Sequence, residues 1–197
     1  MKADIVRELR RKTFHLGGLL YLGAYLSLGH PKTVRVMAVW MVLVAALETA
    51  RLRSMTVRRL LHAVFGAIIR EKENDRYTGA FYTSFGIFLV FLFFGSRPTI
   101  VSAAVLYLTF GDAASALVGK LWGKRRYSVL GQIRSVEGTA AGIAVALLCG
   151  LGLGLPCAAV LAGAAAFALT DTFGFPPDDN LWIPVATGTA LYLLGVR

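Results

Sequence analysis

The stretch T-I-V-S-A-A-V-L-Y-L-T-F-G-D-A-A-S-A-L-V, residues 99–118, decides which kind of fold this chain adopts. An α-helix needs roughly 20 predominantly apolar residues to cross a hydrocarbon core of about 30 Å, and this stretch has that length and character. It contains one carboxylate, Asp112, near its end. Because a carboxylate inside a membrane helix costs about 2.5 to 3.5 kcal/mol on insertion scales, Asp112 needs a cationic partner or a hydrated cavity. The stretch therefore predicts a transmembrane helix that carries an acid at one membrane face.

The composition of the whole chain indicates a membrane protein rather than a soluble domain. Apolar residues make up 56% of the 197 residues and charged residues only 16%, and the mean hydropathy is +0.64. Six spans stay open as an alternative to seven, because little more than Pro156 separates the fifth apolar run from the sixth. We expect an all-α, polytopic helical bundle that forms a single domain over residues 1–197. Its seven expected transmembrane helices are at residues 14–29, 34–50, 77–94, 99–118, 139–155, 157–170 and 181–196.

Lysine and arginine gather in alternate connections between these runs. The formal net charge is +10, and most of the basic side chains lie before the first run, at residues 51–76 and at residues 120–134. By the positive-inside rule, we expect these segments and the N-terminus on the cytoplasmic side of the membrane. We expect no nucleic-acid partner, because the basic segments lack the soluble scaffold of a nucleic-acid reader. Cys149 and Cys157 show neither disulfide nor zinc-site spacing.

The second basic segment also predicts an amphipathic helix that lies in the membrane interface. Arg58, Arg59 and His62 fall between apolar residues at helical spacing. Two interpretations stay open: the helix anchors its loop, or it forms a gate through which a lipid headgroup reaches the site. The apolar residues at helical spacing are Val57, Leu60, Leu61, Val64, Phe65 and Ile68.

Polar side chains from every predicted span gather at its cytoplasmic end. One explanation is structural, in which Glu48 and Asp112 pair with Arg51 or Lys120 and hold helices together. We favour an active site, because helix packing does not require so many carboxylates, hydroxyls and amides at one depth. The gathered residues are Lys12, His15, Glu48, Arg51, Glu73, Thr78, Tyr82, Asp112, Ser115, Ser135, Glu137, Asp171, Asp178, Asp179 and Asn180.

The residue types at this face suit a magnesium nucleotide. Arginine and lysine side chains bind a polyphosphate, and carboxylate and amide oxygens are the ligands that Mg²⁺ accepts beside phosphates. Gly119 and Gly138 let backbone N–H groups approach phosphate. The stretch G-K-L-W-G-K at residues 119–124 lacks the Walker A spacing, and the serine-hydrolase and zinc-enzyme patterns are also missing. The basic candidates are Arg11, Lys12, Lys124, Arg125 and Arg134, and the acidic and amide candidates are Asp112, Asp171, Asp178, Asp179 and Asn180.

Short motifs along nearly the whole chain resemble the polyprenol kinase group, which contains dolichol kinase, phytol kinase and the CTP-dependent diacylglycerol kinase. Their order and spacing carry the resemblance. Arg134 stands where relatives often have lysine, and Asp171 stands where glutamate is expected. The motifs are R-K-x-x-H at Arg11, Lys12 and His15; E-x-x-R at Glu48 and Arg51; E-x-x-x-x-T-G-x-x-Y at Glu73, Thr78, Gly79 and Tyr82; G-D-A-A at residues 111–114 with Gly119; S-x-E-G at Ser135, Glu137 and Gly138; and D-D-N-x-x-x-P at Asp178, Asp179, Asn180 and Pro184.

The resemblance implies a kinase, with its active site facing the cytoplasm, that uses CTP and Mg²⁺ to phosphorylate the hydroxyl of a membrane lipid alcohol. Arg11 and Lys12 are then expected to bind the CTP phosphates, and Asp112 with one or more of Asp178, Asp179 and Asn180 to bind the metal. Glu137 or Asp112 is expected to take the proton from the lipid hydroxyl, and His15 to orient a phosphate or the base.

Two rival functions stay open. A CTP:lipid-phosphate cytidylyltransferase needs the same metal and basic groups but makes a CDP-lipid. A small membrane transporter is the more distant alternative, because the chain shows no inverted repeat and its polar residues lie at one face rather than at the midplane.

Overall fold

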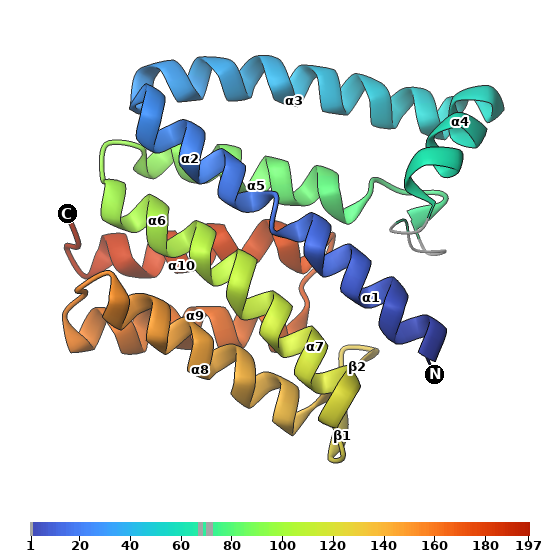
Figure 1. Cartoon of the computed structure of the whole chain (residues 1–197). Helices are drawn as coiled ribbons and strands as arrows, with labels where there is room; N and C mark the ends of the chain where they lie inside the picture. The colour runs from blue at the N-terminus through green and yellow to red at the C-terminus, as the bar shows by residue number, and fades with distance from the viewer. Residues whose placement is uncertain (1, 67–68, 70–72) are drawn as a thin grey trace.

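Helices make up most of the chain in the computed structural model, which describes residues 2–66, 69 and 73–197 (Figure 1). The helices are α1 (Lys2–His15), α2 (Gly18–Leu28), α3 (His30–Arg53), α4 (Met55–Phe65), α5 (Gly79–Phe94), α6 (Pro98–Leu106), the π-helical segment η2 (Tyr107–Gly111), α7 (Asp112–Trp122), α8 (Val136–Gly152), α9 (Cys157–Phe173) and α10 (Asp179–Leu193). Two short strands, β1 (Arg126–Val129) and β2 (Gln132–Ser135), form an antiparallel hairpin.

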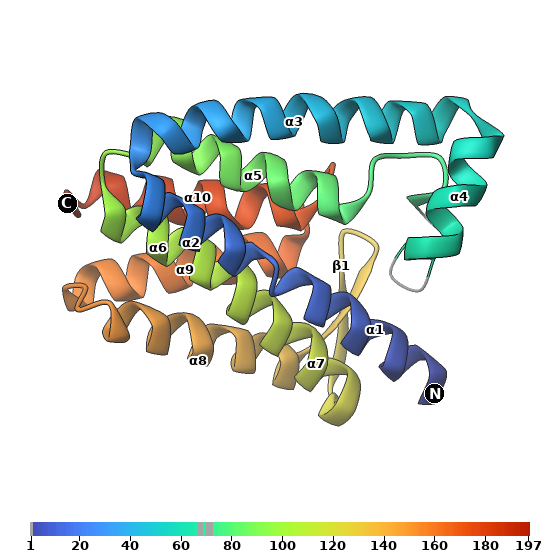
Figure 2. The same cartoon turned by 45° about the horizontal axis from the view of Figure 1, so that its top comes forward.

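Each of the seven predicted apolar runs contains a helix, and these helices lie side by side in both views of the molecule (Figures 1 and 2). Among the described residues, two helical stretches are long and apolar enough to span a membrane, His30–Arg53 and Pro98–Trp122. Three more apolar helices are shorter, at Gly79–Phe94, Val136–Gly152 and Cys157–Phe173. The predominantly helical fold is therefore as expected, and the number of seven spans stays a prediction.

The stretch Pro98–Trp122 lies at the centre of the bundle. In its most apolar window 67% of the residues are buried, compared with 17% in the window of His30–Arg53, which lies along the outside (Figure 2). Tyr107 and Leu108 on this central stretch and Phe167 on α9 are completely buried in the hydrophobic core. The π-helical turn of η2 ends directly before Asp112. π-Helical turns are rare in proteins, and those that do occur often lie at functional sites.

Two features differ from the sequence-based expectation. The run at residues 14–29 is not one continuous helix, because the α-helix stops at His15 and resumes at Gly18. A Cβ at Gly18 would lie 2.6 Å from Thr109 Oγ1, so the close approach of α2 to the central stretch requires this glycine. The chain is also not entirely helical, since residues 120–134 contain the β-hairpin. Its turn uses Leu130 and Gly131 with φ of 48° and 77°.

The predicted amphipathic helix is confirmed as α4. Ser54 caps its N-terminus, where the hydroxyl accepts a hydrogen bond from Val57 N at 3.4 Å. Leu60 and Val64 are 66% and 65% exposed, so part of the apolar side of α4 is open. Ile68, the last residue of the predicted apolar face, lies outside the described residues.

Helices α5 and α10 cross in close contact at Gly86. A Cβ at Gly86 would lie 2.9 Å from the Asn180 carbonyl oxygen and 3.0 Å from that of Leu181, and backbone atoms cannot move aside cheaply. We expect Gly86→Ala to lower the free energy of unfolding by about 1 to 3 kcal/mol, measured by thermal unfolding in detergent. Gly23→Ala is the control, because among the described residues no atom beyond its chain neighbours and the backbone of its own helix lies within 4 Å of its Cβ position. Equal stability of the two variants would contradict this crossing.

Candidate active site

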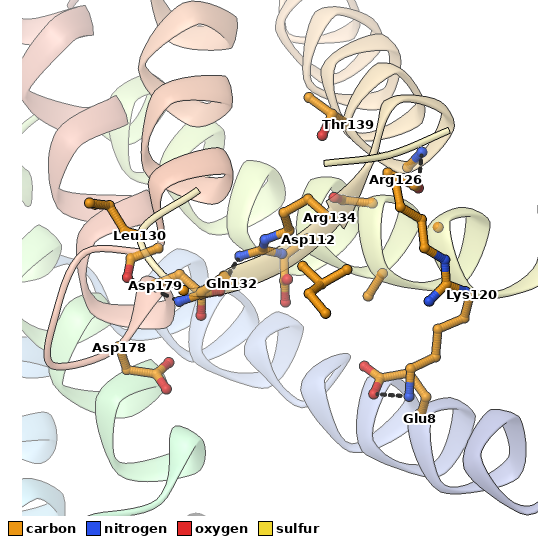
Figure 3. Close-up of a pocket in the computed structure, with 18 of the residues that line it drawn as sticks. Glu8, Asp112, Lys120, Arg126, Leu130, Gln132, Arg134, Thr139, Asp178 and Asp179 are labelled. Carbon is orange, nitrogen blue, oxygen red and sulfur yellow. Dashed lines mark hydrogen bonds and ion pairs between the residues drawn. The ribbon is translucent and has the colours of Figure 1, made fainter. Parts of the chain in front are cut away.

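A polar cavity of about 760 Å³ lies at one end of the bundle, where α1, α7, the β-hairpin and the start of α10 meet (Figures 1 and 3). Segments that are far apart in the sequence contribute to it. The sequence-predicted site residues that line this cavity are Arg11, Asp112, Gly119, Arg134, Ser135, Gly138, Asp178 and Asp179.

Three acids from three different helices converge in this region. Carboxylate oxygens of Asp112, Asp171 and Asp179 all lie within 4.8 Å of one another. Asp112 is 3% exposed and Asp171 is completely buried. The sequence predicted Asp112 and Asp179 as metal ligands but assigned Asp171 a supporting position. The cluster of hard oxygen donors therefore shares Asp112 and Asp179 with the predicted set and contains Asp171, which the sequence analysis had not assigned to the metal.

Two cations contact these acids. Arg134 donates from Nη1 to Asp171 Oδ1 at 3.1 Å and from Nη2 to Asp179 Oδ2 at 2.8 Å. The Lys12 ammonium forms a buried ion pair with Asp112. Burial disfavours the charged form of Arg134, but Asp171 and then Asp179 outweigh it and raise the pKa of the guanidinium. Burial also lowers the pKa of Lys12, and Asp112 opposes that shift.

Further contacts of the cluster come from the hairpin and from α7. Ser115 donates a hydrogen bond from Oγ to Asp171 Oδ2 at 2.7 Å. Gln132 Oε1 accepts a hydrogen bond from Arg134 at 3.1 Å (Figure 3). The predicted site residue Arg134 is thus held in place from the hairpin as well as by the acids.

Asp178 and Asn180, both predicted as metal ligands, contact each other at the start of α10. Asp178 caps α10, because its Oδ1 accepts hydrogen bonds from Asn180 N at 3.1 Å and from Asn180 Nδ2 at 2.6 Å. Asn180 does not line the polar cavity but lines a separate apolar groove. The consecutive residues Asp178, Asp179 and Asn180 therefore differ in their contacts: Asp178 and Asp179 both line the polar cavity, only Asp179 of the two belongs to the acid cluster, and Asn180 lines the groove.

Glu137 and Lys124 are not among the residues that line the polar cavity. The Glu137 carboxylate accepts hydrogen bonds from the backbone N–H groups of Lys124 at 3.1 Å and Arg125 at 3.2 Å. This contact holds the start of the hairpin segment against the first turn of α8. The structure thus gives Glu137 a local structural contact away from the acid cluster.

Ser135, Gly119 and Gly138 meet where α7 packs against α8. Ser135 caps α8 by accepting a hydrogen bond from Gly138 N at 3.1 Å. A Cβ at Gly138 would lie 2.6 Å from the Ser115 carbonyl oxygen and 2.9 Å from Gly119 Cα. The two glycines therefore permit the close approach of the helices at the edge of the cavity.

Arg51 and Glu48 form a second buried polar network. Arg51 is 1% exposed and donates to Glu48 Oε2 at 2.8 Å and to the carbonyl oxygens of Glu73 at 3.0 Å and Arg76 at 2.6 Å. Glu48 also accepts hydrogen bonds from Thr78 N and Oγ1, both at 3.1 Å. For Glu48 the structural explanation therefore holds, because this network ties the segment before α5 to the end of α3.

The remaining supporting residues, Glu73 and Tyr82, lie in the segment before α5 and in the first turn of α5. Glu73 Oε1 accepts a hydrogen bond from Gly79 N at 3.4 Å. Tyr82 packs edge-on against Phe81, with ring centroids 5.3 Å apart.

An apolar groove of about 950 Å³ lies beside the polar cavity, between α2, α3, α4 and α5. Leu61, Val64 and Phe65 of α4 line it, so the amphipathic helix forms part of its wall. Arg11 lines both the groove and the polar cavity. His15 lines the groove, and its Nε2 lies 3.4 Å from Asp112 Oδ2 and 3.3 Å from the Leu108 carbonyl oxygen. The groove and the acid cluster are thus neighbours across His15 and Arg11.

The sequence reasoning missed this groove and one acid of the cavity. Glu8 is 7% exposed, pairs with Arg11, and lies 3.0 Å from Lys120 Nζ (Figure 3). The spacing of Glu8 and Arg11, three residues apart on a helix, is the local signal that could have indicated the pair. Arg126 and Gln132 also line the cavity, and only the hairpin brings them there.

Comparison with curated proteins finds lipid kinases. The chain is 28% identical over 155 residues to the CTP-dependent diacylglycerol kinase 1 of Schizosaccharomyces pombe, a match covering 69% of each chain. It is 31% identical over 118 residues to the enzyme of that name from Eremothecium gossypii, covering 59% of this chain and 37% of the relative. It is 38% identical over 64 residues to the phytol kinase of a Synechocystis species, covering 32% of this chain and 28% of the relative.

The chain therefore spans well under half the length of two of these three relatives. No protein-family model matches the chain, and no solved structure matches it significantly. The names of the relatives confirm the resemblance to the polyprenol kinase group that the motifs indicated.

The pairing of Glu8 predicts a pH-dependent stability. Burial alone would raise the pKa of Glu8, but Arg11 and Lys120 outweigh it and lower the pKa from 4.5 to about 2. A lowered carboxyl pKa stabilises the fold above the unfolded-state pKa, and this contribution is lost as the pH falls from about 4.5 towards 2. We expect Glu8→Gln to lower Tm by a few degrees near pH 7 and about pH 5, and by less near pH 3.

The control is Asp75→Asn, because the Asp75 side chain is 92% exposed. Thermal unfolding of both variants and the wild type in detergent across this pH range measures the effect. A Tm difference for Glu8→Gln that does not shrink below about pH 4 would contradict the ion-pair explanation.

Proposed function

We propose that this chain, a relative of CTP-dependent diacylglycerol kinases and phytol kinases, is a lipid kinase that transfers the γ-phosphate of CTP to the hydroxyl of a membrane lipid alcohol. The acceptor is a polyprenol or dolichol, a phytol-like isoprenoid alcohol, or a diacylglycerol. The observation that carries the proposal is the pairing of a polar cavity, which contains acids and arginines, with an adjoining apolar groove. A kinase with one water-soluble and one membrane substrate requires two such compartments side by side.

The polar cavity suits the nucleotide. Arg11, Arg126 and Arg134 line it, and guanidinium groups bind phosphate oxygens in a bidentate manner. In phosphoryl transfer the protein mainly positions the reactants and neutralises charge. These arginines are suited to both tasks, because they can bind the phosphates and offset their negative charge. CTP as the donor is supported by the names of two relatives.

The acid cluster fits a magnesium ion. Mg²⁺ prefers oxygen ligands and is usually bound by one or two carboxylates together with substrate phosphates, and three carboxylate oxygens lie within 4.8 Å of one another here. Asp112, Asp171 and Asp179 would hold the ion, which would neutralise charge on the phosphates. Arg134 bridges Asp171 and Asp179, and Lys12 forms an ion pair with Asp112. The two cations therefore fix the positions of the three acids.

We assign acceptance of the hydroxyl proton to Asp112 rather than to Glu137. Asp112 lines the polar cavity and lies 3.4 Å from His15, which lines the groove. Glu137 is engaged with backbone N–H groups outside the cavity. His15 thus lies between the lipid compartment and the proposed base, where it is suited to orient the reacting groups.

The membrane arrangement that accompanies this function is multi-pass, with the polar cavity and the N-terminus on the cytoplasmic side. Arginine and lysine residues surround the cavity, as the positive-inside rule requires for a cytoplasmic face. The groove then opens towards the lipid, and the apolar face of α4 lies in the interface beside it.

The decisive assay incubates the protein in detergent with Mg²⁺, lipid alcohols and CTP labelled at the γ-phosphate. We expect label to enter the organic-extractable lipid, and Asp112→Asn to reduce the rate at least 100-fold because it removes both a metal ligand and the proposed base. Asp75→Asn, an exposed acid, is the matched control and should retain wild-type activity.

Label that enters lipid only from the α-phosphate would instead establish the cytidylyltransferase. Absence of transfer from either position, with CTP or ATP, would favour the transporter.

Metal binding gives a second test that does not depend on turnover. We expect Asp171→Asn to weaken binding of Mn²⁺, used in place of Mg²⁺, about tenfold or more in the presence of CTP, measured by electron paramagnetic resonance. Asp75→Asn again serves as the control. If Asp178→Asn weakened Mn²⁺ binding and Asp171→Asn did not, the metal site would be the one predicted from the sequence instead.

A further inference from the structure

Two buried polar atoms in the apolar groove have no hydrogen-bond partner among the described residues, Asn180 Oδ1 and Thr83 Oγ1. Asn180 is 2% exposed and Thr83 is 7% exposed, and both line the groove. An unsatisfied buried polar group is rare in folded proteins and unfavourable, so each such atom requires an explanation.

The orientation of the Asn180 amide follows from its neighbour. Asn180 Nδ2 donates to Asp178 Oδ1 at 2.6 Å. A carboxylate can only accept hydrogen bonds, so the nitrogen must face Asp178 and the amide cannot be turned over. The oxygen is therefore the atom that is left unpaired, and it can only accept a hydrogen bond.

Thr83 lies at the same helix contact as Asn180. It stands on α5 between Gly79 and Gly86, and these three positions share one face of the helix. A Cβ at Gly79 would lie 3.1 Å from Asn180 Nδ2, and one at Gly86 would lie 2.9 Å from the Asn180 carbonyl oxygen. The Thr83 hydroxyl, a group able to donate a hydrogen bond, is thus placed beside the α10 segment that supplies the unpaired acceptor.

The other hydroxyl and indole groups in this part of the groove are already paired. Trp40 Nε1 donates to Tyr21 at 3.0 Å, the Tyr21 and Ser84 hydroxyls are 2.8 Å apart, and Ser84 donates to the Ala80 carbonyl oxygen at 3.0 Å. Since Ser84 donates to a carbonyl, Tyr21 must be the donor to Ser84. The Trp40 N–H group and the Tyr21 and Ser84 hydroxyls therefore all donate to partners within the protein.

We propose that Asn180 Oδ1 and Thr83 Oγ1 form the binding subsite for the hydroxyl of the lipid acceptor. An alcohol donates one hydrogen bond and accepts others, so a single hydroxyl satisfies both unpaired atoms. Before transfer the O–H group donates to Asn180, and the oxygen accepts from Thr83 while keeping a second lone pair for the phosphorus. The proton leaves the hydroxyl for Asp112 only as the new P–O bond forms and the bond to the CDP leaving group breaks. The inference rests on the proposed function and concerns how the acceptor binds before transfer. It moves Asn180 from the metal site to the lipid site.

The test measures lipid binding without nucleotide, so that it is independent of catalysis. The probes are geranylgeraniol and its methyl ether, which cannot donate a hydrogen bond, competed against radiolabelled geranylgeraniol on the detergent-solubilised protein. We expect the wild type to bind the alcohol about tenfold more tightly than the ether, Asn180→Leu to bring this ratio close to one, and Thr83→Val to weaken binding of both probes several-fold.

Thr189→Val on α10 is the matched control, because it makes the same substitution at an exposed hydroxyl that bonds to the Val185 carbonyl oxygen outside the groove. We expect it to bind both probes like the wild type. A wild type that does not distinguish the alcohol from the ether would overturn the subsite. If Asn180→Leu does not fold, Thr83→Val decides alone, and unchanged affinity for the alcohol overturns the subsite.

The phosphoryl-transfer assay separates this inference from the proposed function. If the protein binds the alcohol more tightly than the ether, loses this preference in Asn180→Leu and transfers no phosphate, the subsite is supported and the kinase is refuted. Transfer by the wild type, with an unchanged KM for the lipid in Asn180→Leu and Thr83→Val, supports the kinase and refutes the subsite.

Discussion

The buried ion pair between Lys12 and Asp112 couples the amino-terminal helix to the centre of the bundle. Asp112 begins α7 within the helical stretch whose most apolar window is 67% buried. A charge at such a position is strongly unfavourable without a partner, and breaking a buried pair typically costs about 3 to 5 kcal/mol. Lys12 on α1 is the counter-charge. The docking of α1 against α7, which closes one side of the polar cavity, therefore depends on this contact.

Arg134 has a corresponding position on the other side of the acid cluster. Its guanidinium joins Asp171 of α9 to Asp179 of α10, and the hairpin that carries it is held by Glu137 at the start of α8. Three carboxylates at this spacing repel one another. Arg134 and Lys12 offset this repulsion, because each forms an ion pair with acids of the cluster. The same cations are well placed to share phosphate oxygens when a nucleotide and metal occupy the cavity.

The second polar network has a different consequence. The Glu48 and Arg51 side chains satisfy backbone groups of the segment that leads into α5, and this fixes where α5 begins. Thr83 on α5 and Asn180 on α10 then face the groove with unpaired atoms, whereas the tyrosine, tryptophan and serine farther along it are paired. A structural ion pair thus sets the position of the helix that carries part of the proposed lipid subsite.

The sequence by itself determined the predominantly helical class, the apolar runs that contain helices, the amphipathic helix α4 and several of the residues that line the polar cavity. These features depend on local hydrophobic pattern and on the high cost of charges in apolar segments, both of which are readable residue by residue. Only the tertiary structure decided which carboxylates meet. Asp178, Asp179 and Asn180 are consecutive, yet one caps a helix, one joins the acid cluster and one faces the groove. The position of Asp171, the contact of Glu137 and the groove itself likewise depend on how separate helices pack. Periodicity within one segment carries no information about its neighbours, so the sequence could name the chemical groups but not their partners.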